Sequence, residues 1–211
     1  MVDFLSLGPA RAKTTILLAH GAGAAMDSEW MNGFAEALAA MGLRVVRFEF
    51  AYMAARRDGQ RKPPPKAEKL MDEYRMAVAA LQAKGPLIIG GKSMGGRVAS
   101  LVAEDLFAAG SVAGFACLGY PFHPPGQPEK LRTEHLYGLT LPALICQGTR
   151  DVFGNRDEVA AYRLKKPVAL HWLEDGDHDF RPRKAISGRT MAQNLAEAVA
   201  AVAGFAVALP R

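Results

Sequence analysis

The chain has 211 residues, of which half are hydrophobic and 22% are charged. This is the composition of a chain that folds around an apolar core, and it excludes a disordered or fibrous protein. The formal net charge is +5, but we interpret the excess as a solvated basic loop and not as a nucleic-acid-binding face, because it gathers in one segment. That segment contains Arg56, Arg57, Arg61, Lys62, Lys66 and Lys69.

Short apolar runs alternate with longer amphipathic stretches, without an internal repeat or a linker between independent halves. The apolar runs predict buried strands over Thr14–Ala19, Leu43–Phe48, Pro86–Gly90, Val112–Leu118, Leu141–Cys146 and Val168–Leu173. Helical spacing of apolar residues predicts helices over Glu29–Met41, Glu68–Ala83, Met94–Ala109 and Gly188–Leu209. This alternation predicts one α/β domain over residues 1–211, with a mostly parallel sheet of about six strands and helices on both faces.

Two connections depart from the regular alternation. Residues 54–66 read AARRDGQRKPPPK, and their glycine and three consecutive prolines predict an irregular loop over the carboxyl edge of the sheet. Residues 119–140 have room for a loop and one short helix but not for a lid domain, so we expect an open site. Basic residues of the loop would then favour acidic or acyl-chain substrates. The side chains expected to border this site and to bind substrate are Phe50, Tyr52, Phe122 and Arg57.

The segment Gly91–Gly95 reads GKSMG and fits the pattern G-x-S-x-G. It comes directly after one predicted strand and directly before a predicted helix. A serine in this position stands on a tight, strained turn, and small neighbours keep the adjacent backbone clear of it. The pattern predicts that Ser93 is a nucleophile.

A carboxylate and an imidazole follow two later strands. Asp151 comes just past the strand Leu141–Cys146, and His178 comes just past the strand Val168–Leu173. Because carboxyl ends of parallel strands meet at one edge of the sheet, we expect both side chains near Ser93. His178 would take the serine proton as a general base, and Asp151 would fix the imidazole tautomer.

Negative charge that develops on a substrate oxygen needs hydrogen-bond donors. The segment HGAG, residues 20–23, closes the first predicted strand. We assign the backbone N–H groups of Ala22 and Met94 to this oxyanion hole, because backbone donors are already oriented.

The motifs HGAG, GGKSMGG, GTRD and GDHDF resemble those of the α/β-hydrolase superfamily, and the order Ser, Asp, His is the order of its triads. The stretches YMAARRDGQRKPPP and LGYPFHPPGQPEKLRTEHL are similar to its small, capless, dienelactone-hydrolase-like branch, so the resemblance covers nearly the whole chain. It implies a serine esterase or related acyl hydrolase that needs no metal or cofactor. Two departures stand out: dienelactone hydrolases proper use cysteine in place of Ser93, and the first strand pair of the full-length fold is expected to be absent.

Three other interpretations fit the residues less well. A phosphate-binding loop would need glycine at position 86, where the chain has proline. A dinucleotide fingerprint would need a small residue at position 26, where the chain has methionine. The acidic cluster in residues 174–179 has no second group of ligands to form a metal site, so we interpret it as a solvated loop.

The two cysteines, Cys117 and Cys146, lie inside apolar runs and are expected to be free thiols in a reducing compartment. We expect no secretory leader and no membrane span, since the longest apolar stretch, Ala198–Leu209, is too short to cross a bilayer. These expectations indicate a cytoplasmic protein that binds neither membrane nor nucleic acid.

Taken together, the sequence predicts cleavage of a small-molecule carboxylic ester, or a related acyl bond, through an acyl-Ser93 intermediate. The alternative is a non-catalytic scaffold that keeps the fold and binds a protein partner. Such a scaffold need not retain all three triad members.

Overall fold

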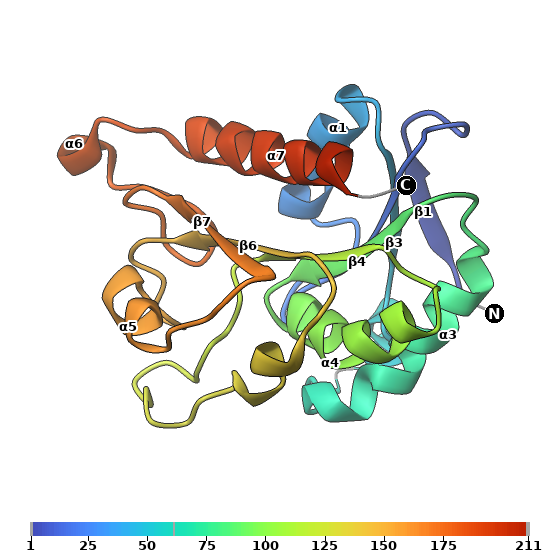
Figure 1. The fold of residues 1–211 in the computed structure, drawn as a ribbon, viewed down its shortest axis with the longest axis horizontal. Helices are drawn as coiled ribbons and strands as arrows, with labels where there is room; N and C mark the ends of the chain where they lie inside the picture. Colours follow the sequence, from blue (N-terminus) through green and yellow to red (C-terminus); the bar gives the residue numbers. More distant parts are fainter. Residues whose placement is uncertain (1, 61, 210–211) are drawn as a thin grey trace.

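A computed structural model describes residues 2–60 and 62–209, and in this part of the chain seven strands form one sheet in the order β1-β3-β2-β4-β5-β6-β7 (Figure 1). The edge strand β1 runs antiparallel to β3, and every other neighbouring pair is parallel. The strands are β1 Phe4–Leu7, β2 Thr15–Ala19, β3 Arg44–Phe48, β4 Leu87–Lys92, β5 Gly114–Leu118, β6 Ala143–Gly148 and β7 Val168–Leu173.

Helices cover both faces of the sheet. The α-helices are α1 Glu29–Ala40, α2 Ala51–Arg57, α3 Met71–Leu81, α4 Met94–Ala108, α5 Arg156–Ala161, α6 Lys184–Ser187 and α7 Met191–Ala208. Two 3₁₀-helices, η1 Ala67–Leu70 and η2 Glu134–Gly138, precede α3 and β6. In Figure 1, α1 and α7 lie above the sheet and α3, α4 and α5 lie below it.

The six predicted strands are confirmed to within two residues at each end. Strands β2, β4, β5 and β6 are buried along their whole length, because apolar side chains pack against helices on both faces. This explains why their sequences are near-continuous apolar runs instead of alternating ones.

The expected absence of the first strand pair is wrong for one strand. Residues Phe4–Leu7 form β1, which pairs with β3 from Phe4↔Phe48 to Leu7↔Val45. Four residues, three half-buried and one exposed, give too short a pattern to predict a strand from sequence.

The predicted irregular segment 54–66 also needs correction, because its first four residues belong to α2. The stretch AYMAARR consists mostly of helix-favouring residues, and the helix ends before Gly59, which has a φ of +81°. Arg61, another residue of this segment, lies outside the described residues. The chain between β5 and β6 holds η2 and no lid domain.

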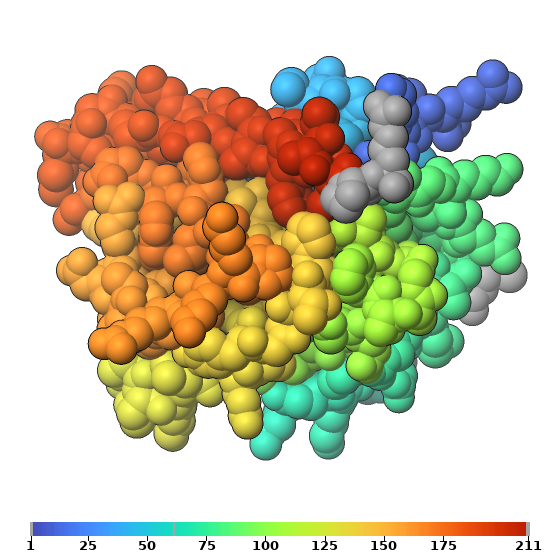
Figure 2. Space-filling model, viewed as in Figure 1, coloured from blue at the N-terminus to red at the C-terminus, as the bar shows by residue number. Residues whose placement is uncertain are grey.

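Helix α7 is capped by Thr190 and Gln193, each of which bonds the other's backbone N–H. Within residues 2–60 and 62–209, it is the one helix long and apolar enough to cross a membrane, judged by length and composition alone. In the structure its buried face, which includes Ala198, Val202 and Ala206, packs against the sheet and α1. Figure 2 shows α7 in red along the top of the molecule.

Candidate active site

Ser93 stands on a sharp turn between the end of β4 and the start of α4. Its φ is +51° and its ψ is −116°, a conformation that costs a residue with a side chain about 1 to 3 kcal/mol. Its backbone N–H donates to the Leu118 carbonyl at 3.0 Å, which ties the turn to β5. The turn projects the hydroxyl group away from the sheet edge.

At this turn the backbone passes very close to β2. A Cβ atom on Gly95 would lie 2.5 Å from the carbonyl oxygens of both Ala19 and His20. A Cβ on Gly91 would lie 2.4 Å from the Ala19 oxygen. Glycine at these positions therefore lets α4 begin directly against the sheet.

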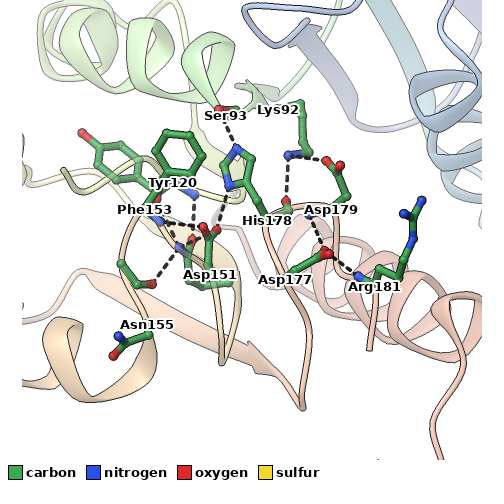
Figure 3. Close-up of polar contacts among 12 residues, drawn as sticks. Lys92, Ser93, Tyr120, Asp151, Phe153, Asn155, Asp177, His178, Asp179 and Arg181 are labelled. Carbon is green, nitrogen blue, oxygen red and sulfur yellow. Dashed lines mark hydrogen bonds and ion pairs between the residues drawn. The ribbon is translucent and has the colours of Figure 1, made fainter. Parts of the chain in front are cut away.

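The hydroxyl of Ser93, the imidazole of His178 and the carboxylate of Asp151 form a continuous hydrogen-bonded relay (Figure 3). Ser93 Oγ lies 2.8 Å from His178 Nε2, and His178 Nδ1 lies 2.8 Å from Asp151 Oδ2. An ionised carboxylate can only accept, so Nδ1 carries the proton and leaves Nε2 free to accept from the serine. The structure thus brings together the three residues that the sequence predicts as a triad.

Asp151 is completely buried, and three donors satisfy its carboxylate. Besides His178, these are the Gln147 side-chain amide, 2.9 Å from Oδ2, and the Phe153 backbone N–H, 2.9 Å from Oδ1. Gln147 also bonds the backbone of Tyr120 and the carbonyl of Gly154. Gln147 was not among the predicted site residues, although it is the one amide inside the apolar run ALICQG.

Lys92 fixes the loop that carries His178. Its side chain is 9% exposed, and its ammonium group donates to the His178 carbonyl at 2.8 Å and pairs with Asp179 at 3.1 Å. The same loop is closed by Asp177, whose carboxylate accepts from the backbone N–H groups of Asp179 and Arg181. The imidazole is therefore positioned both by the contacts of the backbone that carries it and by its hydrogen bond to Asp151.

The backbone N–H groups assigned to the oxyanion hole lie beside Ser93. Ala22 and Met94 line one hollow together with the serine. Among residues 2–60 and 62–209, neither N–H group has an acceptor, as expected for Met94 at the first position of a helix. Both donors remain available to a substrate oxygen.

Two buried side chains hold the Ala22 segment in place. His20 Nε2 accepts from the Phe50 backbone N–H at 3.2 Å, and its Nδ1 lies 2.6 Å from the Gly21 carbonyl. Burial lowers the pKa of His20, so the ring stays neutral. The Tyr52 hydroxyl donates to the Ala22 carbonyl at 3.1 Å, and burial raises its pKa to about 12.

Two hollows meet at Ser93 and share Ala22 and Phe153 as lining. The larger has a volume of about 420 Å³. The smaller has about 310 Å³ and is lined by His178. Phe153, which the sequence analysis did not single out, packs on the imidazole with ring centroids 4.3 Å apart.

The four predicted substrate-binding residues do not line either hollow. Phe50 and Phe122 are fully buried in aromatic clusters, and Tyr52 braces the Ala22 segment as described. Arg57 makes ion pairs with Glu49 and Asp27 and lines a separate hollow. The prediction that these residues bind substrate is therefore corrected. Aromatic residues that follow a strand can turn into the core, and carboxylates neutralise Arg57.

The acidic cluster around His178 is occupied by protein partners. Asp175 binds Arg183 and Arg150, and Arg183 above all holds the pKa of that carboxyl well below its usual range. In the part of the chain that the structure describes, no three His, Cys, Asp or Glu side chains come together as metal ligands would. The carboxylates of this loop serve to shape it.

A family model described as "Alpha/beta hydrolase domain" matches residues 12–207. Among solved structures, a dienelactone hydrolase from Anabaena variabilis shares 18% identity at a TM-score of 0.74, covering 100% of this chain and 93% of that one. An alpha-beta serine hydrolase homologue from Coxiella burnetii shares 19% at 0.71, covering 95% and 91%. A serine hydrolase without lid from Xanthomonas campestris shares 19% at 0.70, covering 99% and 91%. At such identities the likeness is one of fold.

Proposed function

The chain belongs to the α/β-hydrolase family, whose model matches residues 12–207, and on this premise we propose that it is a serine hydrolase that cleaves carboxylic esters. The single observation that carries the proposal is the relay from Ser93 through His178 to Asp151. The strained φ of Ser93 supports it, because strain of this kind persists where a side chain must be presented to a substrate.

The reaction begins when His178 Nε2 takes the hydroxyl proton of Ser93. Oγ forms a bond to the ester carbonyl carbon, and the carbonyl electron pair moves onto oxygen. The free N–H groups of Ala22 and Met94 stabilise that oxyanion, each contributing about 3 to 4 kcal/mol to transition-state stabilisation. Asp151 stabilises the imidazolium formed.

Collapse of this intermediate breaks the bond to the alcohol, which leaves with the proton from His178 Nε2. Ser93 is then an acyl ester. A water molecule, deprotonated by His178, attacks the same carbonyl carbon and releases the acid, and the proton returns to Ser93. The chemistry requires no group beyond these side chains, the two N–H donors and water.

Turnover of 4-nitrophenyl acetate tests the proposal against a non-catalytic scaffold. Ser93→Ala removes the nucleophile and should lower kcat by about 10⁴-fold or more. Ser111→Ala makes the same chemical change at an exposed turn beyond α4 and is the matched control. Equal rates for wild type and Ser93→Ala would refute the proposal.

A further inference from the structure

We propose that the larger hollow beside Ser93 is an anion subsite, and that the substrate carries a carboxylate on its acyl chain. This inference rests on the proposed ester hydrolysis and names its substrate class. It follows from the charges that line the hollow, from two guanidinium groups with unused donors, and from the side of Ser93 on which they lie.

The lining of the larger hollow is net positive. It includes three basic side chains, Lys66, Arg97 and Arg132, and one acidic side chain, Glu68. Their formal charges leave an excess of two positive charges beside the nucleophile. This excess of positive charge favours an anionic ligand.

Arg132 has an unpaired guanidinium group on a backbone that two hydrogen bonds hold in place. Its backbone N–H donates to the Phe122 carbonyl at 2.8 Å, and its carbonyl accepts from the Tyr120 hydroxyl at 2.9 Å. Among the residues described, no carboxylate pairs with the guanidinium. Burial, together with the charge of Arg97, lowers the pKa of Arg132.

Arg97 adds a second set of donors on a rigid helix. It lies one turn after Ser93 on α4, and its backbone N–H donates to the Ser93 carbonyl at 3.0 Å. One terminal nitrogen, Nη2, pairs with Glu68, whereas the other, Nη1, has no hydrogen-bond partner among the described residues. This terminal N–H group can donate to a ligand oxygen in the hollow.

The position of His178 assigns this hollow to one side of the scissile bond. The proton that His178 takes from Ser93 passes to the departing alcohol, so the alcohol must lie beside His178. His178 lines the smaller hollow and not the larger one. The acyl chain therefore extends into the larger hollow, where a distal carboxylate meets Arg97 and Arg132 in the planar, forked geometry that guanidinium groups favour.

The experiment compares kcat/KM for two esters with the same leaving group and acyl chains of equal length, 4-nitrophenyl hexanoate and the 4-nitrophenyl half-ester of adipic acid. The wild type should prefer the adipate half-ester by about tenfold or more, the effect of one charge-assisted hydrogen bond. Raising the ionic strength should reduce this preference, because the hollow is open to solvent.

Arg132→Gln should bring the ratio of the two kcat/KM values close to one, because the two acyl chains are equal in length, and Arg132→Lys should restore part of the preference. Both variants keep the backbone hydrogen bonds of residue 132. Arg11→Gln removes the same charge at an exposed turn before β2, on the opposite edge of the sheet, and should leave the ratio unchanged.

A second ester pair places the charge on the alcohol: 4-carboxyphenyl hexanoate and its methyl ester. Preference for the carboxylate only in this pair would overturn the acyl assignment. If the wild type hydrolyses the hexanoate ester but does not prefer the adipate half-ester, the subsite is refuted while the proposed function stands. The same conclusion follows if Arg11→Gln loses the preference as much as Arg132→Gln does. If the wild type hydrolyses none of these esters, the proposed function fails, and the subsite with it.

Discussion

The side-chain amide of Gln147 donates a hydrogen bond of 2.9 Å to the buried carboxylate of Asp151. Gln147 is itself completely buried at the end of β6, and its other contacts are to the backbone of Tyr120 and Gly154. The Gln147 amide thus connects the Asp151 carboxylate, which orients His178, to the backbone at Tyr120 and at Gly154.

Replacement of Gln147 by methionine keeps the volume of the side chain and removes these hydrogen bonds. Buried polar groups left unpaired cost about 1 to 3 kcal/mol each, so we expect a loss of about 2 to 4 kcal/mol in the free energy of unfolding. Urea denaturation measures it. Gln60→Met, at an exposed position, is the control and should change stability by less than about 0.5 kcal/mol. Equal stability of Gln147→Met and wild type would show that the amide has no structural role.

Gly95 is predicted to tolerate no side chain, because a Cβ atom would lie 2.5 Å from two carbonyl oxygens of the β2 segment. Gly95→Ala should therefore give insoluble protein or one that has lost the turn at Ser93. The matched change is Gly204→Ala at an exposed position in the last turns of α7, where a Cβ meets nothing within 4 Å. It should raise the free energy of unfolding by about 0.5 to 1 kcal/mol. Circular dichroism and urea unfolding check both, and a stable Gly95→Ala would contradict the packing described.

His135 is a half-buried histidine whose tautomer follows from its neighbours. Its Nε2 lies 2.8 Å from Ser100 Oγ and 3.3 Å from the Tyr120 hydroxyl. Each hydroxyl already donates its proton to a backbone carbonyl, so Nε2 must carry the ring proton and donate. Burial and the nearby charge of Arg97 lower the pKa of His135 from 6.5 to about 4.

This shift predicts a loss of stability in acid. The unfolded chain binds the His135 proton at a higher pH than the folded chain does. The free energy of unfolding is therefore unaffected by this group above pH 6.5, and it decreases as the pH falls from 6.5 to about 4. We expect a loss of about 2 kcal/mol, less than the full shift implies because the ring is partly exposed. Urea unfolding of wild type and His135→Gln at pH 7 and pH 4.5 measures it. The glutamine can donate without titrating, so its stability should fall less; equal losses would contradict the assignment.

The positions of Ser93, Asp151 and His178 could be predicted because each comes within a few residues of the carboxyl end of a strand. Six apolar runs identified the strands, and parallel strands end at a common edge, so three residues distant in sequence were expected at one place. Short-range patterns were sufficient for this part of the site. They were also sufficient for the start of α1, which begins at Glu29 as predicted.

The lining of the hollows could not be predicted in the same way. Phe50 and Phe122 follow strands just as the relay residues do, yet both turn into the core. Arg97 occupies a helix position whose direction depends on how α4 packs against η1 and η2. Arg132 lies in a connection whose path is set by backbone bonds to Tyr120 and Phe122. These directions depend on tertiary packing, which no local pattern encodes.

The most direct test of the central claim is covalent labelling of the purified protein with a fluorophosphonate, followed by peptide mapping by mass spectrometry. A serine activated by the relay should take up one equivalent of reagent, on Ser93, and His178→Asn should abolish labelling while the protein remains folded. An unlabelled wild-type protein, or an adduct on a different residue, would contradict the account.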